Sequence, residues 1–112
     1  MTLYLSVFDK MHTMGYYLEM KDFEWNEDKN QRLKQYRSIS FEEVAYYIEN
    51  GGLIDSYEHP NKERYPNQSI FVVLTDCYVY IVPYVEEENY YFLKTIIPNR
   101  EAKKRYMEDD DG

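Results

Sequence analysis

Aromatic and acidic residues alternate in MKDFEW, the segment 20–25. Phe23 and Trp25 fall on one side of an extended chain and the carboxylates on the other, which is the two-residue period of a half-buried strand. Asn26 follows, and its side chain can cap a helix. We expect that helix to run to about Arg37.

A second helix is predicted within ISFEEVAYYIENGG, residues 39–52. Ser40 and Glu43 have the S-x-x-E spacing of a capping box, which marks a helix start. The apolar residues that follow recur at helical spacing and form one stripe; they are Phe41, Val44, Ala45 and Ile48. Gly51 can adopt the left-handed conformation that ends a helix.

The second half of the chain is rich in apolar runs of strand length. The expected strands are 53–57, 69–75, 78–85 and 90–97. Pro83 lies inside the strand 78–85 and cannot donate a backbone hydrogen bond. We therefore expect either that its N–H side lies at an edge of the sheet or that the strand bulges there.

A last helix is expected from Arg100, with Asn99 as its cap. The predicted order is therefore β-α-α-β-β-β-β-α. Because strands follow helices in blocks, this order favours an α+β fold with an antiparallel sheet and helices packed on one face.

Length and composition restrict the class of protein. A chain of 112 residues with 44% hydrophobic and 18% aromatic residues forms one packed domain. Cys77 is the single cysteine, so no intrachain disulfide forms and a reducing cytoplasm is expected. One cysteine and two histidines give no zinc-ligand spacing, and we expect no metal or cofactor. No membrane span is expected.

The charge is unevenly distributed. The chain has 13 Lys and Arg against 21 Asp and Glu, a formal net charge of -8, which disfavours binding to phosphate chains. In residues 94–105, however, five cations accompany one carboxylate, a local charge of +4. These residues are Lys94, Arg100, Lys103, Lys104 and Arg105, with Glu101.

Four motifs in this order resemble one known family. They are FEWNEDK (23–29), SFEEV (40–44), the pair Glu63-Arg64, and IIPNREAKKRY (96–106). The set is similar to the BrnT family of bacterial type II toxins, within the RelE/ParE-like superfamily, and it covers residues 20–107. The resemblance implies an N-terminal extension (1–19), a toxin domain (20–107) and an acidic tail (108–112). Met20 coincides with the usual family start, so the extension is an added strand or a mis-assigned start.

The resemblance implies a metal-independent endoribonuclease that is neutralised by a small ribbon-helix-helix antitoxin, which in turn binds DNA. Arg64 falls on the arginine of the family's Glu-Arg pair and Arg100 on the arginine before its last helix. The chain departs from the pattern where the family has Lys-His, here Tyr36-Arg37. Such departures and the acidic balance favour an alternative, a protein-binding module of the same fold without catalysis. A third idea, an acidic mimic of nucleic acid, conflicts with the basic segment.

Metal-free RNA cleavage requires proton transfer and stabilisation of the phosphate charge. We expect Arg64, Lys94 and Arg100 to converge on one phosphate-binding pocket; the alternative is that they balance surface carboxylates. His59 is the candidate for proton transfer, because imidazole exchanges protons near neutral pH, although a solvent-exposed or cap-like loop histidine is commoner. Glu63 would orient its neighbour or accept a proton, unless it only forms a local ion pair.

Further residues are candidates for RNA contact. Tyr65 can stack on a base. The closing helix carries three cations that would grip an RNA backbone or an acidic antitoxin segment: Lys103, Lys104 and Arg105. Another group shares one strand face, for which packing under a helix is favoured over base stacking: Tyr78, Tyr80 and Tyr84.

Overall fold

A computed structural model describes residues 21–108 of the chain. In chain order the elements are β1 (Asp22–Trp25), α2 (Glu27–Arg37), α3 (Phe41–Tyr47), the π-helical turn η1 (Ile48–Gly52), β2 (Leu53–Glu58), β3 (Gln68–Leu74), β4 (Val79–Glu86), β5 (Tyr90–Leu93), β6 (Ile97–Pro98), α4 (Arg100–Lys103) and the π-helical turn η2 (Lys104–Glu108). The predicted extension (1–19) and residues 109–112 of the predicted acidic tail (108–112) lie outside the described residues.

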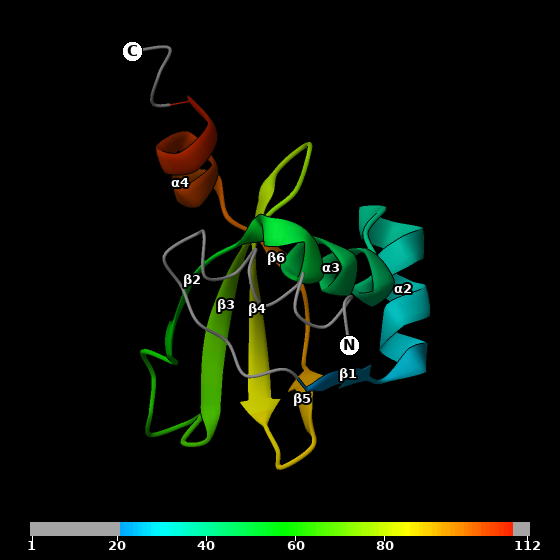
Figure 1. Cartoon of the computed structure of the whole chain (residues 1–112), viewed down its shortest axis with the longest axis vertical. Helices are drawn as coiled ribbons and strands as arrows, with labels where there is room; N and C mark the ends of the chain where they lie inside the picture. The colour runs from blue at the N-terminus through cyan, green and yellow to red at the C-terminus, as the bar shows by residue number, and fades with distance from the viewer. Residues whose placement is uncertain (1–20, 109–112) are drawn as a thin grey trace.

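The strands form one mixed sheet in the order β1-β5-β4-β3-β2, and β6 continues along β4 beyond β5 (Figure 1). The α+β class is confirmed, but the prediction of an antiparallel sheet is wrong at one edge, where β1 runs parallel to β5. The cause is the connection between them. Only neighbouring antiparallel strands can be joined by a tight turn, whereas the chain from β1 passes through both helices and three strands before it reaches β5.

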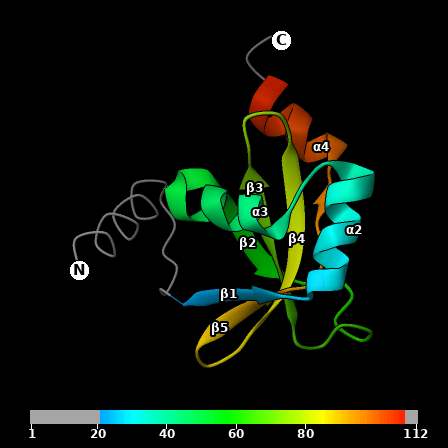
Figure 2. The ribbon, with the colours of Figure 1, turned by 90° about the vertical axis from the view of Figure 1, so that its right-hand side faces the viewer.

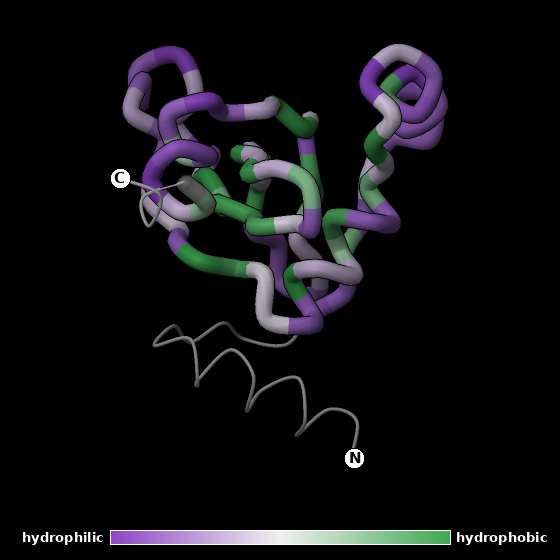
Figure 3. The backbone as a smooth tube through the Cα atoms, turned by 90° about the horizontal axis from the view of Figure 1, so that it is seen from above, coloured by the Kyte–Doolittle hydropathy of each residue, from purple (hydrophilic) through white to green (hydrophobic). Residues whose placement is uncertain are grey.

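The core lies between the sheet and the pair α2 and α3 (Figure 2). The apolar stripe of α3 is buried as predicted, since Phe41, Val44 and Ile48 are all fully inaccessible. Phe23 and Trp25 of β1 pack against this core. Seen from above, hydrophobic positions gather in the strands, and α2 stands at the margin as a largely hydrophilic helix (Figure 3).

Helix α4 does not join the other helices on their face of the sheet. Phe71 and Val73 of β3 face the core, while Val72 between them points to the opposite side and lines a groove with Ala102 of α4. The prediction that all helices pack on one face is therefore wrong for α4. Its residues are mostly charged and none of them is buried, so α4 has no apolar stripe to place in the core.

Pro83 explains why the predicted strand 90–97 is divided. Tyr84 of β4 pairs with Leu93, and Ile81 of β4 pairs with Ile97. From the first pair to the second, β4 spans three residue steps and its partner spans four. The extra residue is a bulge, as expected beside a proline that has no N–H to donate. The chain stays attached at this point because the Lys94 N–H donates to the Pro83 carbonyl at 2.8 Å.

The predicted helix caps are confirmed. The side-chain oxygen of Asn26 accepts from the Lys29 N–H, and that of Asn99 accepts from the Ala102 N–H. Both halves of the capping box between Ser40 and Glu43 are formed. These caps fix the directions in which α2, α3 and α4 start.

Candidate nucleic-acid interface

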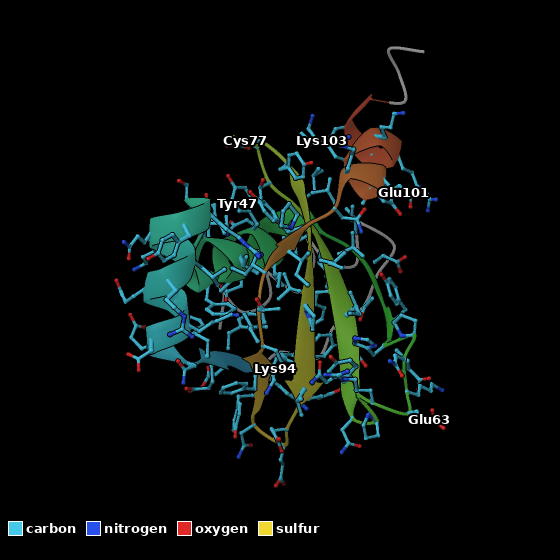
Figure 4. The ribbon with its side chains drawn as sticks, turned by 180° about the vertical axis from the view of Figure 1, so that it is seen from behind. Tyr47, Glu63, Cys77, Lys94, Glu101 and Lys103 are labelled. Carbon is cyan, nitrogen blue, oxygen red and sulfur yellow. The ribbon has the colours of Figure 1, made fainter. Side chains whose placement is uncertain are left out.

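The two arginines that were expected to share a pocket lie at opposite ends of the sheet. Arg64 belongs to the β2–β3 loop, which enters β3 at Gln68, the partner of Val85 in β4. Arg100 follows Asn99, whose N–H donates to Val79 at the other end of β4. The six residue-to-residue steps from Val79 to Val85 correspond to about 20 Å of strand. Figure 4 shows the same separation, with Glu63 at one end and Glu101 at the other. The expected convergence is not observed.

At the β2–β3 loop end, the predicted catalytic residues are occupied by contacts within the loop. The Asn61 N–H donates to Nδ1 of His59, and the His59 ring lies 4.4 Å from that of Tyr65. The Arg64 guanidinium lies over the Tyr65 ring, 5.5 Å from its centroid. These contacts agree with the commoner alternative for His59, a cap-like loop histidine. Glu63 is exposed at the loop tip.

Lys94 contacts neither Arg64 nor Arg100. It follows β5 directly, is exposed, and its ammonium lies 5.4 Å from the Phe92 ring centroid. The three cations expected to bind one phosphate thus occupy three separate places.

At the other end of β4, residues from three elements form a groove of about 420 Å³. It is lined by Arg37 at the end of α2, Tyr78 and Tyr80 at the start of β4, and Pro98 of β6. The Lys103 ammonium borders it, 5.3 Å from the Tyr78 ring centroid. We name these five residues the cation–tyrosine groove. In Figure 4 Lys103 lies beside the β3–β4 turn that carries Cys77.

Arg37 is held in place at the groove by the backbone. Its Nη1 donates to the Ile96 carbonyl at 2.7 Å, so the guanidinium is fixed where the chain bulges between β5 and β6. A guanidinium has five N–H donors, and this bond uses one of them. The remaining donors suit the two oxygens of a phosphate group.

The groove holds two tyrosines that are half-buried and tilted toward each other, with ring centroids 5.7 Å apart. Burial raises the pKa of Tyr80, and the proximity of Cys77 and Glu43 acts in the same direction. A tyrosine hydroxyl is protonated at neutral pH and this shift does not change that, so Tyr80 presents a hydrogen-bond donor to the groove.

The other cations of the closing segment are distributed around α4. Arg100 and Lys104 are exposed. Arg105 lines a separate groove on the outer face of the sheet, together with Tyr57 and Tyr106. Of the basic segment, therefore, Lys103 is the residue that borders the cation–tyrosine groove.

Sequence analysis overlooked Arg37 and assigned the tyrosines only in part. The packing expected for the strand face holds for Tyr84, which is buried and stacked on Phe71 at 3.6 Å. Tyr78 and Tyr80, on the same face, are only half-buried and line the groove. The signal for Arg37 was present, because it stands where the BrnT pattern has its Lys-His pair, but it was interpreted as a departure.

The groove offers cations for a phosphate, and the rings and hydroxyls of two tyrosines for a base. None of its five residues is a carboxylate or an imidazole. Within residues 21–108, no group of three or more His, Cys, Asp or Glu could hold a metal ion. No helix in the same part of the chain is both long and apolar enough to cross a bilayer.

Comparison of the chain with protein-family models, with curated proteins and with solved structures found no match. The BrnT-like assignment thus remains a proposal that rests on the ordered motifs.

Proposed function

We propose that this chain is a toxin of a type II toxin–antitoxin system, with a BrnT-like, RelE/ParE-related fold, that acts on RNA at the cation–tyrosine groove. The observation that carries the proposal is a backbone-anchored guanidinium beside two half-buried tyrosines and an ammonium. Cations that contact phosphate, next to aromatic rings that contact bases, are the common equipment of single-strand binding sites.

In this proposal Arg37 and Lys103 hold one phosphodiester. The guanidinium contacts two oxygens and the ammonium acts as a compact charge, so together they stabilise the negative charge that grows during cleavage. The Tyr78 ring supports a base by stacking. The Tyr80 hydroxyl is the groove's candidate proton donor to the leaving oxygen. The proton of the attacking 2′-hydroxyl passes to bulk water, because none of the five groove residues is a carboxylate or an imidazole. No metal ion takes part.

The proposed partner is a small ribbon-helix-helix antitoxin, which would connect the chain to DNA only indirectly, and the proposed location is the cytoplasm. These assignments rest on the BrnT resemblance alone. An adjacent gene for a ribbon-helix-helix protein, and co-purification of its product with this chain, would test them.

A second candidate function is binding without cleavage. One observation favours it: the groove has no carboxylate or imidazole among its five residues to take the proton from a 2′-hydroxyl. Glu43 is the carboxylate whose charge helps to raise the pKa of Tyr80. Its Oε1, however, already accepts a hydrogen bond from the Ser40 N–H at 3.0 Å in the capping box. A chain of this kind would hold RNA or a partner protein without breaking a bond.

Cleavage and binding can be separated in one assay. The purified chain is incubated with single-stranded RNA in excess EDTA, and cleavage and binding are both measured. The proposal expects cleavage that is lost in Tyr80→Phe, which removes one hydroxyl, and retained in Tyr65→Phe, a matched change in the distant loop. Binding without cleavage would select the second candidate. Absence of both would overturn any RNA-directed function.

A further inference from the structure

A second hollow adjoins the groove on the surface of α2. It measures about 210 Å³ and is lined by Lys29, Arg32, Leu33, Tyr36 and Arg37. These positions follow the spacing i, i+3, i+4, i+7, i+8 and therefore lie on one face of the helix. Arg37 lines both hollows, so the second hollow and the cation–tyrosine groove meet at this side chain.

The charge of this helix face is not neutralised within the described part of the chain. Neither Lys29 nor Arg32 forms an ion pair with residues 21–108, whereas Lys34, on another face of α2, lies 3.8 Å from the Glu42 carboxylate. Glu27, in the first turn of α2, accepts hydrogen bonds from the Trp25 and Gln31 side chains and forms no ion pair with Lys29 or Arg32. The face thus presents two cations to solvent.

Tyr36 adds an aromatic surface to these cations. It is 74% exposed, the largest value among the exposed large hydrophobic residues. An exposed ring next to Lys and Arg is the pairing on which bases of a single strand stack while its phosphates are neutralised.

The helix beneath this face is fixed to the core. Leu33 forms the floor of the hollow and is buried. Asn30 is fully buried and accepts from the Phe41 N–H at 2.8 Å, while its own amide donates to Glu42 at 2.8 Å. The face is therefore a preformed surface, which lowers the entropic cost of binding.

We propose that this face of α2 continues the RNA site and binds the nucleotides of a single strand next to the one in the cation–tyrosine groove. Arg37 contacts the phosphate at the junction, Arg32 and Lys29 contact the following phosphates, and Tyr36 stacks on a base. From Arg37 to Lys29 the helix rises about 12 Å. That length matches about three to four nucleotides at a stacked rise of 3.4 Å. This inference rests on the proposed function.

The test measures binding of the full chain to labelled single-stranded oligoribonucleotides of about two to twelve nucleotides, by fluorescence anisotropy at several salt concentrations. All carry 2′-O-methyl groups, so that none can be cleaved by 2′-hydroxyl attack. We expect affinity to rise with length until the α2 face is filled and then to level off.

Variants separate the two kinds of contact. The double variant Lys29→Gln/Arg32→Gln should lower the slope of log affinity against log salt by about 1.4, since each lost phosphate contact removes about 0.7. Tyr36→Ala should weaken binding about fivefold or more and leave the salt slope unchanged, because stacking involves no counterion. The matched controls are Tyr46→Ala on α3, where the ring is 59% exposed, and Lys62→Gln in the distant loop.

The outcomes distinguish this inference from the function on which it depends. If Lys103→Gln weakens binding while the α2 variants bind like the unaltered chain, the α2 face is not part of the site and the proposed function stands. If the unaltered chain binds no oligoribonucleotide, the proposed function fails. Equal affinity for single-stranded and duplex RNA would overturn the stacking role of Tyr36, because paired bases are not free to stack on it.

Discussion

The two ends of the sheet contain similar residues and use them differently. At the β2–β3 loop, His59, Arg64 and Tyr65 contact one another, and the hollow beside them is lined by Glu58, Glu86 and Glu87, among others. At the end near α4, the cations come from separate elements and meet two tyrosines that the core leaves half-covered.

The difference shows why charges counted along the sequence do not predict which cations lie together in the fold. Positive residues in one loop can contact other residues of the same loop, as Arg64 contacts Tyr65. Residues from distant elements lie together only where the sheet topology brings those elements close to each other. Each prediction below changes one end and uses the other as its reference, from the largest expected effect to the smallest.

Asn30 attaches α2, and with it Arg37, to the core. Asn30→Ala leaves the buried Phe41 N–H without its acceptor, and we expect it to lower the free energy of unfolding by about 1–3 kcal/mol. Urea denaturation measures the change. Asn67→Ala, in the exposed loop at the other end, should stay within about 0.5 kcal/mol. Equal losses of unfolding free energy in the two variants would show that the hydrogen bonds of Asn30 do not attach α2 to the core.

Arg37 and Arg64 compare the two ends directly in RNA binding. Arg37→Lys keeps the charge but cannot both bond the Ile96 carbonyl and clasp two phosphate oxygens, so binding should weaken about tenfold. Arg64→Lys should leave affinity unchanged, because Arg64 lies at the far end of the sheet. Anisotropy titrations measure both. A larger loss in Arg64→Lys would move the site to the loop.

Glu42, next to Asn30, should make the stability of the fold depend on pH. The hydrogen bond from the Asn30 side chain lowers the pKa of Glu42. Since the folded pKa lies below the unfolded one, the contact stabilises the fold above the unfolded pKa and is lost as the pH falls through the folded pKa. Glu42 is exposed, so the contribution is below about 1 kcal/mol.

The measurement is Tm between about pH 6 and about pH 3. Glu42→Gln should melt below the unaltered chain at the upper end, and the difference should disappear toward the lower end. Asn67→Ala, in the loop, changes no titratable group and is the control for the scan. A constant Tm difference for Glu42→Gln across the range would contradict the assignment.

The smallest effect is expected at the loop end. Lys62 and Glu58 form an exposed i, i+4 ion pair. Lys62→Ala should change the free energy of unfolding by less than about 0.5 kcal/mol, because exposed pairs are screened by solvent. Adding salt to the unaltered chain should leave its urea midpoint nearly unchanged for the same reason. A loss above about 1 kcal/mol would mean that this loop is more tightly integrated than described here.

Much of the local structure could be predicted from sequence, because its causes are local. The caps at Asn26 and Asn99 and the box between Ser40 and Glu43 depend on residues within three positions of each other. The buried stripe of α3 follows from helical periodicity, and the disturbance at Pro83 follows from its missing N–H.

The remaining features depend on long-range pairing. The parallel contact of β1 with β5 joins residues 22–25 to residues 90–93, and no local pattern specifies it. Arg37 reaches the groove through a bond to Ile96, a residue 59 positions away. The resemblance to BrnT directed attention to Arg64 and Arg100, yet the register of β4 places them at opposite ends.

The most direct test of the central claim is a titration of the full chain, labelled with ¹⁵N, with a six-nucleotide 2′-O-methyl single strand, followed by backbone amide chemical shifts. The account predicts that the largest changes fall on Arg37, Tyr78, Tyr80 and Lys103 and continue along the exposed face of α2, while residues 59–67 are unaffected. Changes concentrated in residues 59–67, with the cation–tyrosine groove unaffected, would contradict it.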